Sequence, residues 1–225
     1  MKTLIDQIDI KVNDKIYLKD PFSSELGKKI ISVSINLIDE IGLESFTFKK
    51  LATLLETTES SIYRYFENKN KLLIYLISWY WGWIEYQLVF ATANIPSAED
   101  ELKASLKIIA QDVEEGAACH FIKLDILDRI LISESSKAYL TKEVDDANKI
   151  GSYAGYKRVV ARISDTVLKI NPEFKYSHTL ISTIVEGIHH QKYFADHLPS
   201  LTDIKDNPGD LAVFYTDMAL AIIKK

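Results

Sequence analysis

A short run between Thr58 and Tyr65 carries the side chains best suited to reading a polar surface. The run is TESSIYRY, and Ile62 is its one aliphatic residue. An arginine donates two hydrogen bonds to a guanine edge, a glutamate accepts one from cytosine N4, and hydroxyl groups bond to phosphates or bases. On one helix, these residue types indicate contact with nucleic acid rather than catalysis.

Two short helices would position this run. The first has an apolar stripe at i, i+3, i+4 and i+7, formed by Phe48, Leu51, Ala52 and Leu55. Thr47 precedes that stripe and is the expected N-cap. After a turn of about three residues, Thr58 caps a second helix that buries Ile62 and Phe66. Two such helices form a helix-turn-helix, whose second helix enters the major groove of DNA.

The same residues resemble the DNA-binding domain of the tetracycline-repressor (TetR) family. The resemblance rests on T-x-x-x-L-A from Thr47 and on TESSIYRYFENKNKLL, which ends at Leu73, and it covers roughly residues 24–75. Two positions depart from the family, because Glu56 and Ser60 stand where it usually has glycine. A non-glycine residue in a left-handed turn costs about 1–2 kcal/mol, so we expect a somewhat different path for the turn.

The expected DNA-binding residues are Thr47, Lys49, Thr58, Glu59, Ser60, Ser61, Tyr63, Arg64, Tyr65 and Lys69. The resemblance implies that the Tyr63 and Tyr65 hydroxyls donate to phosphate, and that Thr47 and Lys69 lie where helix N-termini hold the DNA backbone. Two alternatives stay open. In the first, Tyr63 only packs between helices. In the second, Glu59 only satisfies the helix dipole.

Composition favours an all-α protein. The 225 residues are 47% hydrophobic with only 8 Gly and 5 Pro, and no stretch alternates like a strand. The single cysteine, Cys119, excludes an internal disulfide and fits a reducing cytoplasm, and the N-terminus does not resemble a signal peptide. The net charge of -5 lies outside residues 1–75, which hold eleven basic and eleven acidic side chains. This charge therefore does not argue against DNA.

The expected organisation is an N-terminal arm (1–22), a three-helix helix-turn-helix domain (23–70), and a helical regulatory and dimerisation domain (71–225). The arm either packs on the first helix or enters the minor groove. The first helix begins at Ser23 or Ser24 and ends at Gly42.

A long helix follows, from the start of the second domain to Pro96. Because Glu85 is the only charged residue between Leu72 and Ala98, a membrane span is the alternative, but its central Trp residues and Glu85 favour a buried helix. Further helices are expected after Ser97, over 119–132, and over 136–150, 153–170, 177–198 and 209–223.

The second domain offers candidates for an effector pocket, although aromatic residues at helical spacing are more often plain core. These candidates are Trp79, Trp83, Tyr86, Phe90, His120 and Phe121. Glu186 and His189 have the i, i+3 spacing of half a di-iron site, but a second such pair is absent from the sequence. No phosphate loop, Cys-x-x-Cys pair or nucleophile elbow occurs. We therefore expect no enzyme activity, no metal and no cofactor.

One helix-turn-helix makes few base contacts, so we expect a homodimer on a palindromic operator. By resemblance, the last two helices form the interface, unless their apolar stripes face only their own core. The candidate interface residues are Leu180, Ile184, Ile188, Phe214 and Met218. The prediction is a cytoplasmic transcriptional regulator, a repressor by resemblance, released by a small apolar effector. The alternative is a helical adaptor that acts through protein or membrane partners.

Overall fold

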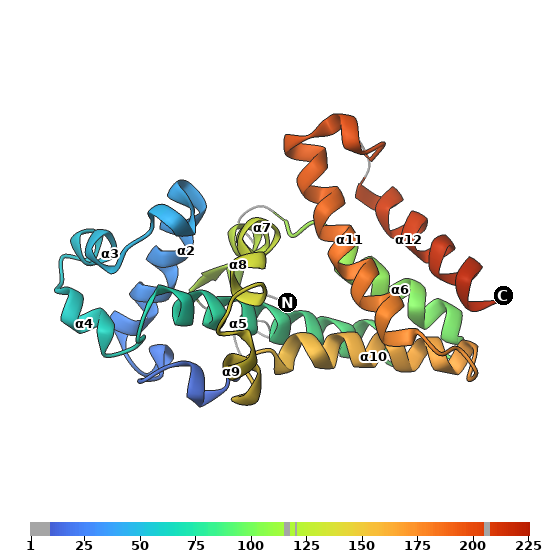
Figure 1. Cartoon of the computed structure of the whole chain (residues 1–225), viewed down its shortest axis with the longest axis horizontal. Helices are drawn as coiled ribbons and strands as arrows, with labels where there is room; N and C mark the ends of the chain where they lie inside the picture. Colours follow the sequence, from blue (N-terminus) through green and yellow to red (C-terminus); the bar gives the residue numbers. More distant parts are fainter. Residues whose placement is uncertain (1–9, 115–117, 120, 205–207) are drawn as a thin grey trace. The chain divides into compact units, whose positions relative to one another are not determined.

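The structure is a computed structural model that describes residues 10–114, 118–119, 121–204 and 208–225. It is predominantly helical, which confirms the all-α prediction (Figure 1). Two compact units divide the chain: residues up to Gly82 with Val113–Ala154, and Trp83–Asp112 with Gly155–Lys225. The division falls inside one long helix. The functional boundaries expected at residues 22 and 70 are a separate matter and stay predictions.

The first unit holds the N-terminal helices and a central segment of the chain. Its elements are η1 (Asp14–Ile16), η2 (Pro21–Ser23), α2 (Glu25–Ser45), α3 (Phe48–Leu54), α4 (Glu59–Tyr63), the start of α5 (Lys69–Ala91), β1 (Ala118–Cys119), β2 (Ile122–Lys123), α7 (Leu124–Glu134), α8 (Ser136–Tyr139) and α9 (Val144–Lys149). Its core includes Ile30, Phe46, Leu51, Phe66 and Trp79, all fully buried.

Helix α2 begins and bends where the sequence predicts. The Ser24 hydroxyl accepts a hydrogen bond from the Gly27 amide at 3.2 Å, which satisfies one of the free N–H groups at the helix start. Gly42 has φ 71°, in the left-handed region that favours glycine, and it interrupts the helical geometry three residues before Ser45. The one turn beyond Gly42 leads directly into α3.

Residues 118–119 and 122–123 are extended rather than helical, contrary to the expectation for 119–132. They form two short antiparallel strands in which Cys119 pairs with Ile122, and the helix α7 begins only at Leu124. Both paired side chains are fully buried. The Phe121 ring lies 6.1 Å from the Phe22 ring, so tertiary packing accompanies the extended backbone.

Two further boundaries differ from those expected. The stretch 136–150 contains two short helices, because the backbone leaves helical geometry at Leu140, with ψ 54°. Helix α5 ends at Ala91 rather than at Pro96, and Asn94 adopts a left-handed φ of 62° in the following turn. Over the described residues, every helix is too short or too polar for a membrane span.

The second unit consists of the end of α5, α6 (Ala98–Ala110), α10 (Ala154–Ile170), α11 (Ser177–His197), η3 (Pro199–Leu201) and α12 (Pro208–Ile223). Helix α12 packs against both α6 and α11 (Figure 1). The Glu85 carboxylate accepts hydrogen bonds from Arg158 at 2.8 and 3.0 Å, which gives a partner to the one charged residue of α5 after Leu72. A buried helix therefore explains Glu85 without a membrane.

The first turn of α2 provides a stability test, because a Cβ added at Gly27 would overlap with the Pro21 carbonyl oxygen and would lie 2.8 Å from its carbon. The obstacle is backbone, so it cannot move like a flexible side chain. Gly27→Ala should lower the free energy of unfolding by about 1–3 kcal/mol in a urea titration. The exposed neighbour change Lys29→Ala should stay within about 0.5 kcal/mol. Equal effects of both changes would contradict the close packing of η2 on α2.

Candidate nucleic-acid interface

Helices α3 and α4 form the expected helix-turn-helix, and each begins at its expected cap. The Thr47 Oγ1 accepts from the Lys50 amide at 3.2 Å, and the Thr58 Oγ1 accepts from the Ser61 amide at 3.3 Å. Ile62 and Phe66 are fully buried, as predicted. Burying such a side chain contributes about 1.5–3 kcal/mol, so this inner face fixes which face of α4 is left outside.

The turn between the helices is left-handed at Glu56, so it does not take the different path expected for a non-glycine residue. Glu56 has φ 51°, and the Thr57 amide donates to the Ala52 carbonyl at 3.0 Å to close the turn. The chain therefore adopts the left-handed turn without glycine, at a cost of about 1–2 kcal/mol. The Glu56 side chain is exposed, so it adds an acid beside the outer face of α4.

The outer face of α4 is polar and open to solvent. Glu59, Ser60 and Arg64 are exposed, and the Glu59 and Arg64 side chains make no hydrogen bond or ion pair with other described residues. The Thr58 hydroxyl lies 2.8 Å from the Ser60 hydroxyl and 2.9 Å from that of Ser61. These three hydroxyls hold each other in place, whereas Glu59 and Arg64 keep their full capacity to bond to bases.

Tyr63 combines packing with exposure. Its ring meets the Phe48 ring edge-on, with centroids 5.0 Å apart, and 48% of the residue remains exposed. No hydrogen bond between described residues involves its hydroxyl. The ring therefore packs between the helices, while the hydroxyl has no partner among the described residues and its contact with phosphate stays a prediction.

Tyr65 does not lie on the outer face, which corrects the prediction for this residue. It is 4% exposed, and its hydroxyl lies 2.6 Å from the Ser24 hydroxyl at the start of α2. The Leu18 amide donates to the Tyr65 carbonyl at 2.8 Å. Two residues after Tyr63, a side chain turns toward the core, so Tyr65 supports α4 from behind and its hydroxyl is already engaged.

Leu18, which makes this hydrogen bond to Tyr65, belongs to the N-terminal segment of the chain. Over its described part, residues 10–22, the chain packs on the first unit: Ile16 is buried and the Tyr17 ring lies 5.8 Å from the Tyr75 ring. This matches the packing alternative for residues 10–22. Residues 1–9, the rest of the expected arm, lie outside the described part.

Lys69 is the first residue of α5, at a helix N-terminus as the resemblance implies, and its contact with DNA stays a prediction. Its ammonium donates to the carbonyl oxygens of Leu43, Glu44 and Phe46 at 2.9, 3.0 and 3.3 Å. These carbonyls lie at the end of α2, where helices leave acceptors unsatisfied. The side chain thus fixes the junction that leads into α3. The Lys49 side chain, in contrast, is exposed.

A second anchor at the same junction was not foreseen. The Glu134 Oε1 on α7 accepts from the Leu43 amide at 3.1 Å, next to the bend at Gly42. Nearby, Arg129 of α7 forms a two-pronged ion pair with Asp39 of α2, at 2.8 and 3.1 Å. Both contacts join residues about 90 positions apart, so local sequence patterns carried no signal for them.

Comparison with known sequences identifies this domain. Residues 30–76, which contain most of α2 and all of α3 and α4, match the model of "Bacterial regulatory proteins, tetR family". Over these residues the chain is similar to the DNA-binding domain of the TetR family. No curated protein matches the chain in sequence.

Solved structures with the TetR-like fold extend the similarity over most of the chain. AibR in complex with isovaleryl coenzyme A and operator DNA is 16% identical with a TM-score of 0.58, and the match covers 85% of this chain and 97% of AibR. A regulatory protein in the tetR family from Rhodococcus RHA1 is 14% identical with a TM-score of 0.60, over 89% and 97% of the two chains. The superantigen PfiT, also 14% identical, has a TM-score of 0.58 over 89% and 97%. At these identities the likeness establishes the fold alone.

The residues expected to form an effector pocket are not joined in one described cavity. Trp79 is fully buried in the first unit, where Phe121 is 38% exposed, whereas Trp83, Tyr86 and Phe90 belong to the second unit. Neither of the two cavities described in the first unit is lined by any of them. His120 lies outside the described residues. An effector site at these residues stays a prediction.

Most of the expected dimer residues face their own core, which corrects that set. Leu180, Ile184 and Ile188 on α11 are 9%, 0% and 0% exposed. Their stripe is used within the second unit, as the alternative had it. On α12, however, Phe214 is 54% exposed and Met218 is partly exposed. The outward face of α12 also carries Val213, Ala221 and Ile222.

Glu186 and His189, which have the spacing of half a di-iron site, are part of the packing of the second unit. The Glu186 carboxylate accepts from the Tyr156 hydroxyl at 2.7 Å, and His189 is buried. Across the described ranges, the acidic, His and Cys residues form no cluster of three or more that could hold a metal ion.

The two lysines of this interface should separate stability from DNA affinity. Lys69→Met removes a charged donor from three carbonyls and should lower the free energy of unfolding by about 1–3 kcal/mol in a urea titration. Lys49→Ala should leave stability unchanged but weaken binding to any DNA duplex, and reduce the slope of log affinity against log salt by about 0.9. The assignment of the two roles is wrong if Lys69→Met leaves stability unchanged while Lys49→Ala lowers it.

Proposed function

We propose that this protein is a homodimeric, cytoplasmic, sequence-specific repressor that binds a palindromic operator and leaves it when a small molecule binds. The observation that carries the proposal is the outer face of α4. This face carries the Arg64 and Glu59 side chains, which have no partner among the described residues. It lies within the segment that matches the TetR family model.

In this proposal the interface residues divide into two groups. Arg64 and Glu59 read bases, because guanidinium and carboxylate groups distinguish guanine and cytosine edges in the major groove. Thr47, Lys49 and Tyr63 position the protein on phosphates, since they surround α4 and are exposed. Thr58, Ser60 and Ser61 contribute hydroxyls at the start of α4. Tyr65 and Lys69 act indirectly, by holding α4 and the α2–α3 junction.

Dimerisation rests on the free face of α12. Val213, Phe214 and Ile222 are 53%, 54% and 41% exposed, and together with Met218 and Ala221 they form an apolar stripe. Exposed apolar patches of this kind are typical of protein–protein contacts. In a twofold dimer the same stripe meets its copy, which brings two recognition helices to paired half-sites about 34–36 Å apart.

Release by an effector follows from a two-state dimer. A ligand that binds one spacing of the recognition helices better than the other shifts the population toward that spacing. AibR, which has this fold, is described with both isovaleryl coenzyme A and operator DNA, and this supports a ligand-responsive regulator. A repressor then loses its operator when the favoured spacing no longer fits the two half-sites.

An adaptor that acts through a protein partner is the second candidate. The likeness to the superantigen PfiT supports it, because that protein shares the fold under a different description. A protein surface does not require free base-reading groups on a five-residue helix α4. DNA is therefore the better partner for this face.

Selection of bound sequences from random duplex DNA at two salt concentrations tests the DNA function. We expect a palindrome and salt-dependent affinity. Arg64→Ala should cost about 1–3 kcal/mol and relax selectivity at one position of each half-site. Tyr63→Phe should weaken binding to every sequence alike, because it removes a phosphate donor. Selection of no motif by the wild type would favour the adaptor.

Sedimentation velocity at micromolar concentration tests the dimer. Phe214→Asp places a charge in the proposed interface and should convert the dimer to a monomer. Leu140→Asp is the matched control, since Leu140 is 85% exposed and lies in the first unit; it should stay dimeric. A monomeric wild type would contradict the dimer, as would dimers of Phe214→Asp.

A further inference from the structure

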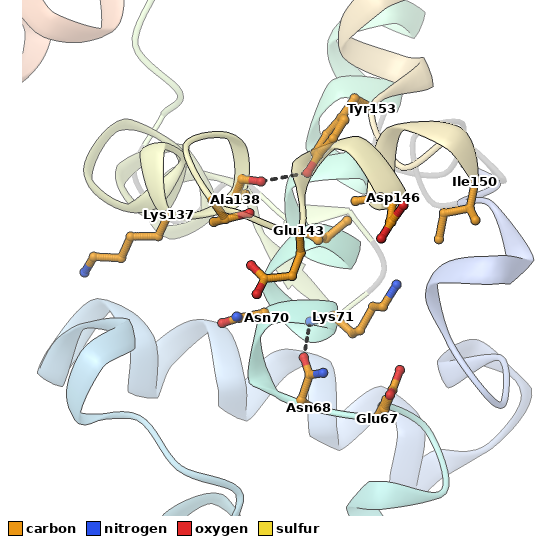
Figure 2. A pocket seen from close by; sticks show the side chains of 13 residues that line it. Glu67, Asn68, Asn70, Lys71, Lys137, Ala138, Glu143, Asp146, Ile150 and Tyr153 are labelled. Atoms are coloured by element: carbon orange, nitrogen blue, oxygen red, sulfur yellow. Dashed lines mark hydrogen bonds between the residues drawn. The ribbon is translucent and has the colours of Figure 1, made fainter.

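A cavity of about 380 Å³ lies in the first unit, beneath the first turn of α5 (Figure 2). One wall is formed by Glu67 to Ile74, which directly follow the recognition helix, and the other by Lys137 to Tyr153 of the α8–α9 segment. The volume falls in the range of small-molecule sites, about 300–1,000 Å³. None of the aromatic residues expected to bind an effector lines it.

The inner surface of the cavity is apolar and held in place. Its apolar lining comes from Ile74, Ala138, Ala147, Ile150 and Tyr153. The Tyr153 hydroxyl donates to the Ala138 carbonyl at 2.7 Å, so the ring has a fixed position (Figure 2). A ligand that fits here needs an apolar body of a few carbon atoms.

The rim of the cavity is charged, and its charges are not equally compensated. Lys137 pairs with Glu134 at 2.5 Å, and Asp146 pairs with Lys149 at 2.8 Å. The other charged lining residues are Glu67, Lys71 and Glu143, and their side chains form no ion pair with a described residue. Two uncompensated carboxylates and one uncompensated ammonium leave a net charge of -1 at the rim.

Glu143 is the carboxylate best placed to meet a ligand. It stands at the N-cap of α9, yet its side chain makes no capping hydrogen bond. Figure 2 shows this carboxylate directed from the α8–α9 segment toward the first turn of α5, while the Lys137 side chain extends away from it.

We propose that this cavity binds an amphipathic organic monocation. An ammonium or guanidinium group pairs with Glu143 and Glu67 at the rim, and the apolar body packs on Ile74, Ile150 and the Tyr153 ring. The ammonium of Lys71 limits the ligand to a single positive charge. A carboxylate or phosphate ligand would meet the excess negative charge and bind less well.

The position of the cavity connects it to the DNA-binding domain. Asn68 caps α5 by accepting from the Lys71 amide at 2.9 Å, and Lys69 between them anchors the α2–α3 junction. A ligand that contacts this turn changes the same backbone that holds the junction. This consequence for DNA rests on the proposed function, whereas the binding itself does not.

Isothermal titration calorimetry of the full chain with three probes of equal chain length tests the proposal without DNA. The probes are hexylammonium, 1-hexanol and hexanoate, which share a six-carbon chain and carry a positive, a neutral and a negative head group at neutral pH. We expect hexylammonium to bind at one site per chain, at least about tenfold more tightly than the other two. Glu143→Gln should weaken hexylammonium about fivefold or more and leave 1-hexanol unchanged.

Asp145→Asn is the matched control, because Asp145 is exposed on α9 but does not line the cavity. It should leave hexylammonium binding unchanged. The proposal is overturned by equal losses in both variants, by hexanoate binding as tightly as hexylammonium, or by no saturable binding up to about 10 mM. Circular dichroism of each variant confirms folding. Since no DNA is present, a failed operator search leaves this test intact.

Discussion

The ammonium group of Lys69 is the contact on which the interface depends. It is shared among three carbonyl oxygens at the end of α2, at 2.9–3.3 Å. Helix ends leave such carbonyls without hydrogen-bond partners. The Lys69 ammonium supplies a charged donor to them at the point where the chain turns sharply into α3. Glu134 satisfies the Leu43 amide of the same junction from α7. Two opposite charges from distant segments thus fix one bend, and α3 and α4 inherit their position from it.

Burial then decides which side of α4 is left for recognition. Ile62 and Phe66 are fully buried, and Tyr65 packs behind the helix with its hydroxyl on Ser24. The outward side carries Glu59 and Ser60 of α4 and Arg64, the residue that follows the helix as its C-cap. Because the inner contacts are tight, the outer groups need no internal partner and remain free for DNA. The same tight inner contacts explain why the turn tolerates a left-handed residue other than glycine at Glu56.

The sequence was informative wherever one turn of chain decides the structure. Thr47, Thr58 and Ser24 are caps, and Gly42 is a break, because these roles depend on hydrogen bonds within a few residues. The contacts of the Tyr65 hydroxyl and the Lys69 ammonium were not predicted, for a different reason. Their partners, Ser24 and the carbonyls of Leu43 to Phe46, lie 23 to 41 positions away.

Larger features that depend on contacts between distant segments were not predictable from local patterns either. A stripe of apolar residues on α11 indicates a buried face but not whether its own chain or a second chain covers it, and the burial of Leu180, Ile184 and Ile188 within one chain distinguishes the two. The pair of short strands at Cys119 and the break at Leu140 depend on tertiary contacts that local periodicity does not encode. The cavity beside α9 is lined by two segments far apart in the sequence, Glu67 to Ile74 and Lys137 to Tyr153, so no local motif indicates it.

Hydrogen–deuterium exchange with and without the selected DNA tests the central claim most directly, namely that α3, its turn and α4 form the DNA surface. Amide exchange reports which backbone segments a ligand covers or stabilises. If α3, its turn and α4 form the DNA surface, amide exchange should slow over residues 47–66 and at the first turn of α5, with little change along α11. Protection confined to segments outside residues 47–73 would contradict it.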